Sequence, residues 1–309
     1  MIELVALFVT VLAVILPAFA EAPLHFARIE RAVIHEKPRA EIIFAGDMMF
    51  DRTVRRAMEE KGPDHIFSCI KDTLLSADLV VANLEGPITP YESMSLGSAI
   101  GSPENFTFTF PTSTASLLAR HNIRVVNLGN NHIKNFGDAG VRETKAFLNA
   151  AQVVYFGDPS QSGSIAREDV GDVLFSFVSW SDWTGASREE TVAHVRAERE
   201  AGRLPIVYTH WGEEYVEARE REKILAREFI DAGAEMVIGS HPHVVQEREF
   251  YRGKTIYYSL GNFMFDQYWN EAVRTGLLVR VTFDDRGVAG IDEIPVTLER
   301  DRRTCLKGE

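Results

Sequence analysis

Short apolar runs alternate with longer amphipathic segments from residue 40 to about residue 240. The apolar runs are short and bounded by Gly, Asn, Asp or Pro, which predicts buried strands. The segments between them repeat apolar residues at helical spacing, which predicts helices. Strands are expected at Glu41–Ala45, Leu79–Ala82, Ile123–Leu128, Val153–Phe156, Val173–Trp180, Leu204–Thr209 and Glu235–Ile238. Helices are expected at Arg52–Glu60, Ile66–Leu75, Ser113–His121, Gly137–Ala151, Ser187–Gly202 and Val216–Ala232.

The pattern changes in the last third of the chain, where strands follow one another with short turns. These strands are expected at Val245–Phe250, Thr255–Leu260, Leu277–Phe283 and Gly290–Leu298, a pattern typical of a β meander. Residues 88–111 are rich in Ser, Thr, Gly and Pro and predict a long loop, inside which Phe106–Phe110 alternates like an exposed edge strand. The sequence thus predicts an α/β domain over residues 40–309, whose sheet is completed by antiparallel strands.

The N-terminal segment calls for a separate interpretation. Leu4–Ala20 is apolar apart from Thr10, and Ala18–Ala20 fits the small-x-small pattern of a signal-peptide cleavage site. We expect residues 1–20 to be a signal peptide or N-terminal anchor and residues 21–39 to be a linker, so that the protein is exported and is secreted or membrane-anchored. The lack of Lys or Arg before the run, and a length slightly below the ~20 residues of a spanning helix, leave a buried terminal helix as an alternative.

Composition and charge narrow the range of functions. A hydrophobic fraction of 45% and a charged fraction of 25% are ordinary for a folded globular protein. The net charge of -12 argues against nucleic acid as a partner, because phosphate contacts need clustered Lys and Arg. Cys69 and Cys305 lie far apart and form no CxxC motif, so a thiolate metal site is not predicted. A disulfide and two free thiols both remain open for this pair.

Potential metal ligands stand at or just after the ends of five predicted strands. They are Asp47, Glu85, Asn131 with His132, His210, and the pair His241 and His243. Because ligands bind at the carboxyl ends of strands in α/β sheets, we expect these side chains to share one site. Carboxylates, amides and imidazoles suit Mn, Zn or Fe, and two ions ~3.5–4 Å apart are held best by a shared carboxylate and separate imidazoles. The sequence therefore predicts one or two divalent metal ions.

Each of these residues also has an explanation that involves no ligand. Asp47 could cap the helix that begins near Arg52, and Glu85 could be a solvated loop acid. Asn131 could be a turn residue, and His210 could be a core histidine bonded to the backbone. One shared site explains the whole set more simply than separate coincidences at five strand ends.

Six motifs, in order over about residues 40 to 270, resemble the motif series of the bacterial capsule-synthesis CapA family. They are Gly46-Asp47-Met48-Met49, Asn83–Pro87, Leu128–His132, His210–Tyr215, Gly239–Gln246 and Tyr258–Phe263. That family is associated with poly-γ-glutamate capsule production and resembles the calcineurin-like metallophosphoesterases. The resemblance implies a metallophosphoesterase-like four-layer α/β sandwich with mixed sheets and a two-metal site.

The resemblance also implies a role for each site residue. Asp47 and His243 would bind a first metal ion, Asn131, His210 and His241 would bind a second, and Glu85 would bridge the two. His132 would protonate the leaving oxygen or orient the substrate. The remaining site candidates would support the ligands by hydrogen bonds or contact substrate, and they are Asn83, Asn130, Glu214 and Asn262.

Three departures from the metallophosphoesterase pattern keep more than one function open. Met49 stands where those enzymes usually carry His, Glu85 replaces the bridging Asp, and Asn135 replaces an Asp that usually follows the His132 position; Glu214 is a candidate to complete the first site. The first hypothesis is a metal-dependent phosphoesterase-like hydrolase acting in capsule, poly-γ-glutamate or envelope polymer metabolism. The alternative is a non-catalytic metal- or polymer-binding accessory subunit of a membrane synthase complex. A third hypothesis is an amide hydrolase that trims the polymer with the same metals.

Overall fold

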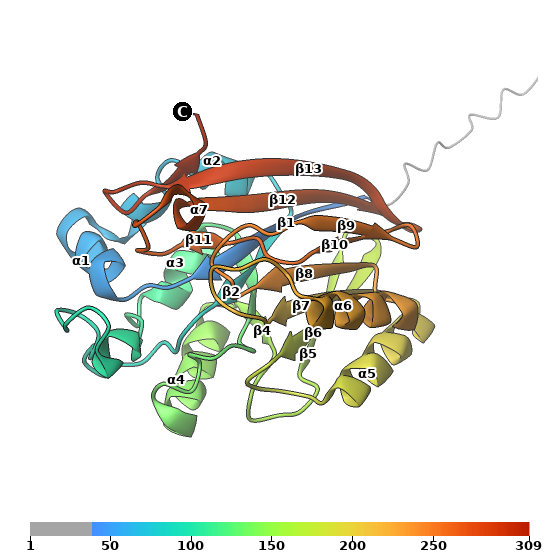
Figure 1. The fold of residues 1–309 in the computed structure, drawn as a ribbon, viewed down its shortest axis with the longest axis horizontal. Helices are drawn as coiled ribbons and strands as arrows, with labels where there is room; N and C mark the ends of the chain where they lie inside the picture. The colour runs from blue at the N-terminus through green and yellow to red at the C-terminus, as the bar shows by residue number, and fades with distance from the viewer. Residues whose placement is uncertain (1–38, 309) are drawn as a thin grey trace, which may run out of the picture. The chain divides into compact units, whose positions relative to one another are not determined.

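The computed structural model describes residues 39–308. The predicted signal peptide or anchor at residues 1–20, and the linker as far as residue 38, lie outside the described residues. Within residues 39–308 the chain forms two mixed β-sheets with helices packed against them (Figure 1). None of the helices in this range combines the length and the apolar character that crossing a membrane requires.

The larger sheet of the described residues has eight strands, in the order β14-β13-β12-β1-β2-β3-β4, with β11 paired to β1. Its strands are β1 (Ala40–Met48), β2 (Leu79–Leu84), β3 (Ile123–Asn127), β4 (Val154–Phe156), β11 (Asn262–Met264), β12 (Thr275–Asp284), β13 (Gly287–Leu298) and β14 (Thr304–Leu306). Strands β1 to β4 run parallel, and β12 to β14 form the antiparallel C-terminal meander.

The smaller sheet has six strands in the order β5-β6-β7-β8-β10-β9. Its strands are β5 (Ile165–Val170), β6 (Val173–Ser181), β7 (Leu204–His210), β8 (Met236–Ser240), β9 (Arg248–Tyr251) and β10 (Lys254–Tyr257). Strands β6, β7, β8 and β10 run parallel. The strands of the last third of the chain therefore divide between the two sheets, because β10 pairs with β8 and not with β12.

Helices pack against both sheets. The α-helices are α1 (Arg52–Lys61), α2 (Lys71–Leu75), α3 (Thr114–Arg120), α4 (Gly137–Ala150), α5 (Arg188–Glu200), α6 (Glu220–Ala232) and α7 (Glu271–Arg274), and the 3-10 helices are η1 (Pro63–Phe67) and η2 (Pro103–Phe106). Ser187 caps α5 by accepting a hydrogen bond from the Glu190 N–H at 3.2 Å. Gly233 ends α6 with a left-handed φ of 115°.

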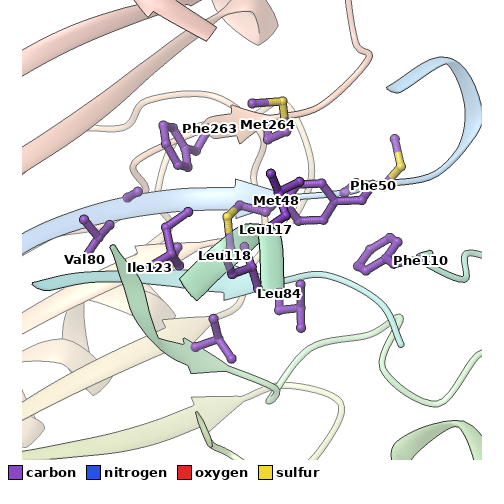
Figure 2. Close-up of a cluster of buried hydrophobic side chains, with 14 of the residues drawn as sticks. Met48, Phe50, Val80, Leu84, Phe110, Leu117, Leu118, Ile123, Phe263 and Met264 are labelled. Carbon is purple, nitrogen blue, oxygen red and sulfur yellow. The ribbon is translucent and has the colours of Figure 1, made fainter. Parts of the chain in front are cut away.

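Alternating side chains of β1 show why the protein has four layers. Ile42 and Phe44 belong to an apolar cluster built from strands of both sheets, which places this cluster between the sheets. Ile43 and Ala45 belong to a second cluster that includes residues of α1, α3 and α4. Figure 2 shows part of that second cluster, with Met48 close to the α3 side chains. A third cluster joins α5 and α6 to the smaller sheet. The layers are thus helix, sheet, sheet and helix, as the resemblance implied.

Three predicted elements differ from the structure. Phe106–Phe110 is not an edge strand, because Phe108 and Phe110 are buried and Phe110 packs edge-on against Phe50 at 5.5 Å. The helix predicted at Ile66–Leu75 is interrupted between η1 and α2. Helix α6 begins at Glu220 and not at Val216. Tyr215, just before that segment, has a φ of 65° and donates its backbone N–H to the Pro242 carbonyl. Strands β5, β11 and β14 were not predicted, since each is short or weakly apolar.

The two cysteines form a disulfide. Cys69, in the interruption between η1 and α2, is bonded to Cys305 of β14, with 4.8 Å between their Cα atoms. Of the two possibilities that the sequence left open, a disulfide and two free thiols, the structure shows the disulfide. It attaches β14, the last strand along the chain, to the segment between η1 and α2.

Candidate metal centre

Strand ends from both sheets meet at one place. Asp47 lies near the end of β1, Glu85 follows β2 and Asn131 lies in the loop after β3, all in the larger sheet. His210 ends β7 in the smaller sheet, and His241 and His243 follow β8. The predicted convergence is therefore observed, with the difference that it joins two sheets and not the neighbouring strands of one.

Two glycines allow the backbones at this place to approach one another. A Cβ atom on Gly46 would lie 1.9 Å from the carbonyl oxygen of Gly261, just before β11. A Cβ atom on Gly239 would lie 1.8 Å from the carbonyl oxygen of Tyr258. Both glycines directly precede motif residues, so the lack of a side chain is what permits this packing of the strands.

Asp47 is buried and held by neighbours from both sheets. Its Oδ1 accepts a hydrogen bond from Asn83 Nδ2 at 2.8 Å, and its Oδ2 accepts one from the His241 backbone N–H at 3.0 Å. Burial alone would raise the pKa of Asp47, but the hydrogen bond with His243 and the charges of His243 and His210 lower it far below its usual value. Asp47 is therefore an ionised carboxylate, the form in which a carboxylate can bind a cation.

Glu85 is the buried carboxylate at the middle of the site. Neither of its oxygens has a hydrogen-bond partner among the described residues. Its Oε1 lies 3.6 Å from His243 Nε2 and 4.0 Å from His210 Nε2. Burial, with the added repulsion of Asp47, raises the pKa of Glu85 well above its usual range. An unpartnered buried carboxylate is costly, and a cation bound beside it removes that cost.

The distances define two groups of side chains that could hold a metal ion. One consists of Glu85, His241 and His243, and the other of Asp47, Glu85 and His210. Within each group the donor atoms lie within 4.8 Å of one another. Glu85 belongs to both groups, as a bridging ligand would. The grouping differs from the one implied by the resemblance, because His241 falls with His243 and His210 falls with Asp47.

The imidazoles are prepared for ligation. Burial, together with the charge of His243, lowers the pKa of His241 to about 4, so this ring is neutral at pH 7. Its Nδ1 is buried without a hydrogen-bond partner in the described part of the chain. His241 and His243 have left-handed φ values of 95° and 57°, which are strained for residues other than glycine. Strain of this kind is typical of functional sites, where the surrounding structure holds it in place.

Amide side chains form hydrogen bonds around the candidate ligands. His210 Nε2 is hydrogen-bonded to Asn131 Oδ1 at 2.9 Å, and His243 Nδ1 to Asn262 Oδ1 at 2.9 Å. Asn130 Nδ2 donates to Asn83 Oδ1 at 3.2 Å and to the Leu84 carbonyl at 2.8 Å. These bonds fix the rings and the loops that carry them. The side chains of Asn83, Asn130 and Asn262 are fully buried.

His132 borders the group with its proton in a defined position. Asn135 Nδ2 donates to the Phe106 carbonyl at 2.8 Å and also lies 3.2 Å from His132 Nδ1. The Phe106 contact fixes the orientation of the amide, so His132 Nδ1 is an acceptor and the ring proton lies on Nε2. That atom is 4.0 Å from Glu85 Oε1. Burial and the charges of His243 and His241 lower the pKa of His132 to about 3.

Glu214 and Met49 lie outside the two groups of candidate ligands. Glu214 is exposed and belongs to neither ligand group, although its charge raises the pKa of both Glu85 and His241. Met49 is buried in the helix-side cluster, and its sulfur accepts a hydrogen bond from the Asp51 N–H at 3.0 Å. Met49 is thus used by the core and not by the site.

Two contacts of the site were not assigned from the sequence. Ser240 Oγ donates to the Thr209 carbonyl at 2.7 Å and lies 3.0 Å from His210 Nδ1, so it helps to orient that ring. Trp183, just after β6, packs against His241 with 4.3 Å between ring centroids. Ser240 belongs to the motif Gly239-Ser240-His241, and its position next to the candidate ligand His241 was the available signal.

Comparison with known proteins places the chain among capsule-synthesis proteins. The family model described as bacterial capsule synthesis protein PGA_cap matches residues 41–267. The PGA biosynthesis protein CapA of Bacillus subtilis is 28% identical over 275 residues, which cover 82% of this chain and 70% of that protein. The capsule biosynthesis protein CapA of Bacillus anthracis is 27% identical over 286 residues, which cover 85% and 69%.

A shorter match involves a probable polyglutamine synthesis accessory protein of Mycobacterium tuberculosis. It is 31% identical over 172 residues, which cover 46% of this chain and 45% of that protein. The family model, by contrast, covers well over half of the chain and all of the site residues named above. The protein therefore belongs to the bacterial capsule synthesis family PGA_cap, whose members are involved in capsule and poly-γ-glutamate biosynthesis.

Proposed function

We propose that this protein is a metal-dependent, phosphoesterase-like hydrolase that acts on a capsule or envelope polymer or its precursors. The observation that carries the proposal is the position of Glu85, a buried carboxylate with no hydrogen-bond partner in the described chain, shared by two groups of metal-ligating side chains. The donor set contains only carboxylate oxygens and imidazole nitrogens, which suits Mn, Zn or Fe.

The residues divide into ligands and supports. Asp47, Glu85, His210, His241 and His243 would hold the metal, with Asn131 as an additional oxygen donor next to His210. Bound divalent ions supply a nucleophilic water at neutral pH and neutralise charge on the oxygens of the reacting group. Asn83, Asn130 and Asn262 keep the ligands in place through the hydrogen bonds described above.

His132 faces the reacting group as a hydrogen-bond donor. Its ring is neutral, and the Asn135 contact leaves the proton on Nε2, on the side of Glu85. From that position Nε2–H donates a hydrogen bond to an oxygen of the substrate, which orients the substrate and stabilises the charge that develops on the leaving oxygen. Phe108 packs on the ring at 4.3 Å and holds its plane in this orientation.

Metal analysis and a matched pair of histidine variants test the proposal. We expect the purified full chain to bind Mn or Zn and to hydrolyse phosphodiester or phosphomonoester substrates. His132→Ala should lose about 10²–10⁴-fold in turnover while keeping its metal and its melting temperature. His194→Ala, on α5, is the control and should retain activity. Failure to bind metal after supplementation with Mn and Zn would contradict the proposal.

A non-catalytic role in polymer synthesis is the second candidate. The core position of Met49, where an imidazole ligand is usual, and the name of the Mycobacterium tuberculosis relative, an accessory protein, support it. In this role the site binds metal or polymer carboxylates, and the protein serves a membrane synthase complex. Polymer production in cells distinguishes the candidates: a strain carrying His132→Ala keeps production if the protein is an assembly factor and loses it if hydrolysis is needed.

We also propose that the protein acts outside the cytoplasm. The disulfide between Cys69 and Cys305 supports this, because such bonds persist mainly in oxidising compartments. The apolar run at Leu4–Ala20 would provide the export signal or anchor. A fusion to alkaline phosphatase, which is active only after export, should be active with the full chain and inactive once residues 1–20 are deleted.

A further inference from the structure

A cavity of about 310 Å³ lies beside the start of α1. Its walls come from α1, from the loop at residues 95–105 and from residues 266–269, and Arg302 closes one side. We call it the arginine pocket, because Arg52, Arg56 and Arg302 line it together with a single carboxylate, Asp266. A concentration of positive charge is notable in a chain whose net charge is -12.

The charges in the arginine pocket do not cancel. Asp266 is already bonded, since its Oδ1 accepts from Arg52 Nη2 at 2.5 Å and its Oδ2 accepts from Thr53 Oγ1 at 2.8 Å. Arg52 Nε is buried and has no hydrogen-bond partner among residues 39–308. Arg56 is exposed and makes no ion pair with any residue in the described range. The lining therefore offers guanidinium groups to an anion.

Aromatic rings connect this pocket to the metal centre. The Arg52 guanidinium lies over Phe108 at 5.0 Å and over Phe265 at 5.5 Å, measured to the ring centroids. Phe108 packs on His132 at 4.3 Å, and Phe265 packs on His243 at 4.8 Å. Only one aromatic side chain thus separates Arg52 from each of two site histidines.

A second path runs along exposed aromatic side chains. Tyr215 faces His243 with 6.1 Å between centroids, and it packs edge-on against Trp269 at 5.3 Å. Trp269 lines the arginine pocket and is 60% exposed. Gln267 Nε2 donates to the Tyr215 hydroxyl at 3.0 Å, which holds Tyr215 in place. These rings form a surface along which a chain molecule can extend from the metal centre to the pocket.

We propose that the arginine pocket is a subsite for carboxylate groups of an anionic polymer chain, part of which lies at the metal centre. Guanidinium groups bind carboxylates in pairs of parallel hydrogen bonds. The Asn105 amide, one N–H of which is donated to Ser98 Oγ, adds a neutral donor to the lining. Trp269 and Ile100, the latter 97% exposed, provide apolar contact for the methylene groups between successive carboxylates. The subsite rests on the proposed function for its substrate class, and it adds the residues that select for charge.

Binding of matched oligomers tests the subsite separately from hydrolysis. The probes are a γ-linked glutamate oligomer, the neutral γ-linked glutamine oligomer of equal length and inorganic polyphosphate, titrated calorimetrically into the full chain. The wild type should bind the glutamate oligomer in preference to the other two, and less tightly as salt is raised. Arg56→Glu should weaken that binding by about tenfold or more, and Arg56→Lys should restore part of it.

The control is Arg196→Glu, an equal change of charge at an exposed position of α5, which should leave the affinity unchanged. The subsite is contradicted if Arg56→Glu binds as the wild type does, or if the glutamine oligomer binds equally well. Tighter binding of polyphosphate would overturn the assignment to carboxylates. Chromatography of the same samples reports cleavage of the oligomer independently. Binding that depends on Arg56, without any cleavage, supports the subsite and counts against the hydrolase. Cleavage with an unchanged KM in Arg56→Glu supports the hydrolase and counts against the subsite.

Discussion

The carboxylate of Asp47 accepts a hydrogen bond from the backbone N–H of His241 at 3.0 Å, across 194 positions of the chain. Asp47 belongs to the larger sheet and His241 follows a strand of the smaller one. The bond therefore ties the two sheets together at the place where the candidate ligands meet. Because His241 holds a strained φ of 95°, this bond also helps to keep its ring directed toward the site.

Glu85→Gln should separate the effect of the buried charge from the effect of the metal. In chelator-treated protein at pH 7 we expect the variant to be at least as stable as the wild type, because it removes a carboxylate that repels Asp47 and has no hydrogen-bond partner in the described chain. Added Mn should stabilise the wild type by about 2.7 kcal/mol at a hundredfold excess over its Kd, and should stabilise the variant much less.

Thermal melts with and without Mn measure the effect of Glu85→Gln. Glu59→Gln, at an exposed position of α1, is the matched control and should respond to Mn as the wild type does. An equal rise in Tm for Glu85→Gln and the wild type would rule out Glu85 as a ligand.

Gly46→Ala should damage both stability and metal content. The new Cβ atom would overlap the Gly261 carbonyl oxygen, which lies only 1.9 Å from its ideal position, so β1 and the segment before β11 must separate. We expect a loss of at least ~2 kcal/mol in the free energy of unfolding, measured in urea, and a lower metal content. Gly290→Ala, whose Cβ would meet Thr282 atoms at 3.9 Å, should change stability little; similar losses in both variants would contradict the explanation.

Glu198 should make stability depend on pH. The hydrogen bond from Arg167 lowers the pKa of Glu198, burial opposes that effect, and Ser176 Oγ strengthens it by donating a further bond. A folded-state pKa below the ordinary value of 4.5 means that this stabilisation is complete above pH 4.5. It is lost as the pH falls through the lowered pKa.

The free energy of unfolding of the wild type should therefore exceed that of Glu198→Gln by about 1 kcal/mol at pH 7. The difference is small because Arg167 is partly exposed, and it should vanish in acid. Urea unfolding at a series of pH values measures it. Glu200→Gln, exposed on the same helix, should show no such trend. If the difference in the free energy of unfolding stays constant as the pH falls, the charge of Glu198 is not its cause.

Removal of the disulfide should weaken the whole domain. The bond between Cys69 and Cys305 closes a loop of 236 positions, and its loss frees the unfolded chain. We expect the double variant Cys69→Ser with Cys305→Ser to lose about 2–5 kcal/mol. Its stability should not respond to reductant, whereas that of the wild type should; a wild type that ignores reductant would show that the bond contributes nothing.

Local sequence pattern is enough to predict most of the helices and strands and the kinds of side chain at the strand ends. A strand buried on both faces is an apolar run, and polar residues that follow the run mark the end of the strand. Local pattern alone therefore places four side chains at strand ends: Asp47, Glu85, His210 and His241. Caps such as Ser187 were predictable for the same reason, since capping depends on neighbours three residues away.

How those strand ends come together depends on the folding of the whole domain. The local pattern is the same whether β10 pairs with β8 or with β12, so the division of strands between two sheets could not be read from it. The same holds for Phe108, which alternates like an exposed strand residue and is buried against His132. Pairing, burial and ligand grouping depend on contacts between residues distant in the sequence, and those contacts are selected by packing of the whole domain and not by the sequence pattern around each residue.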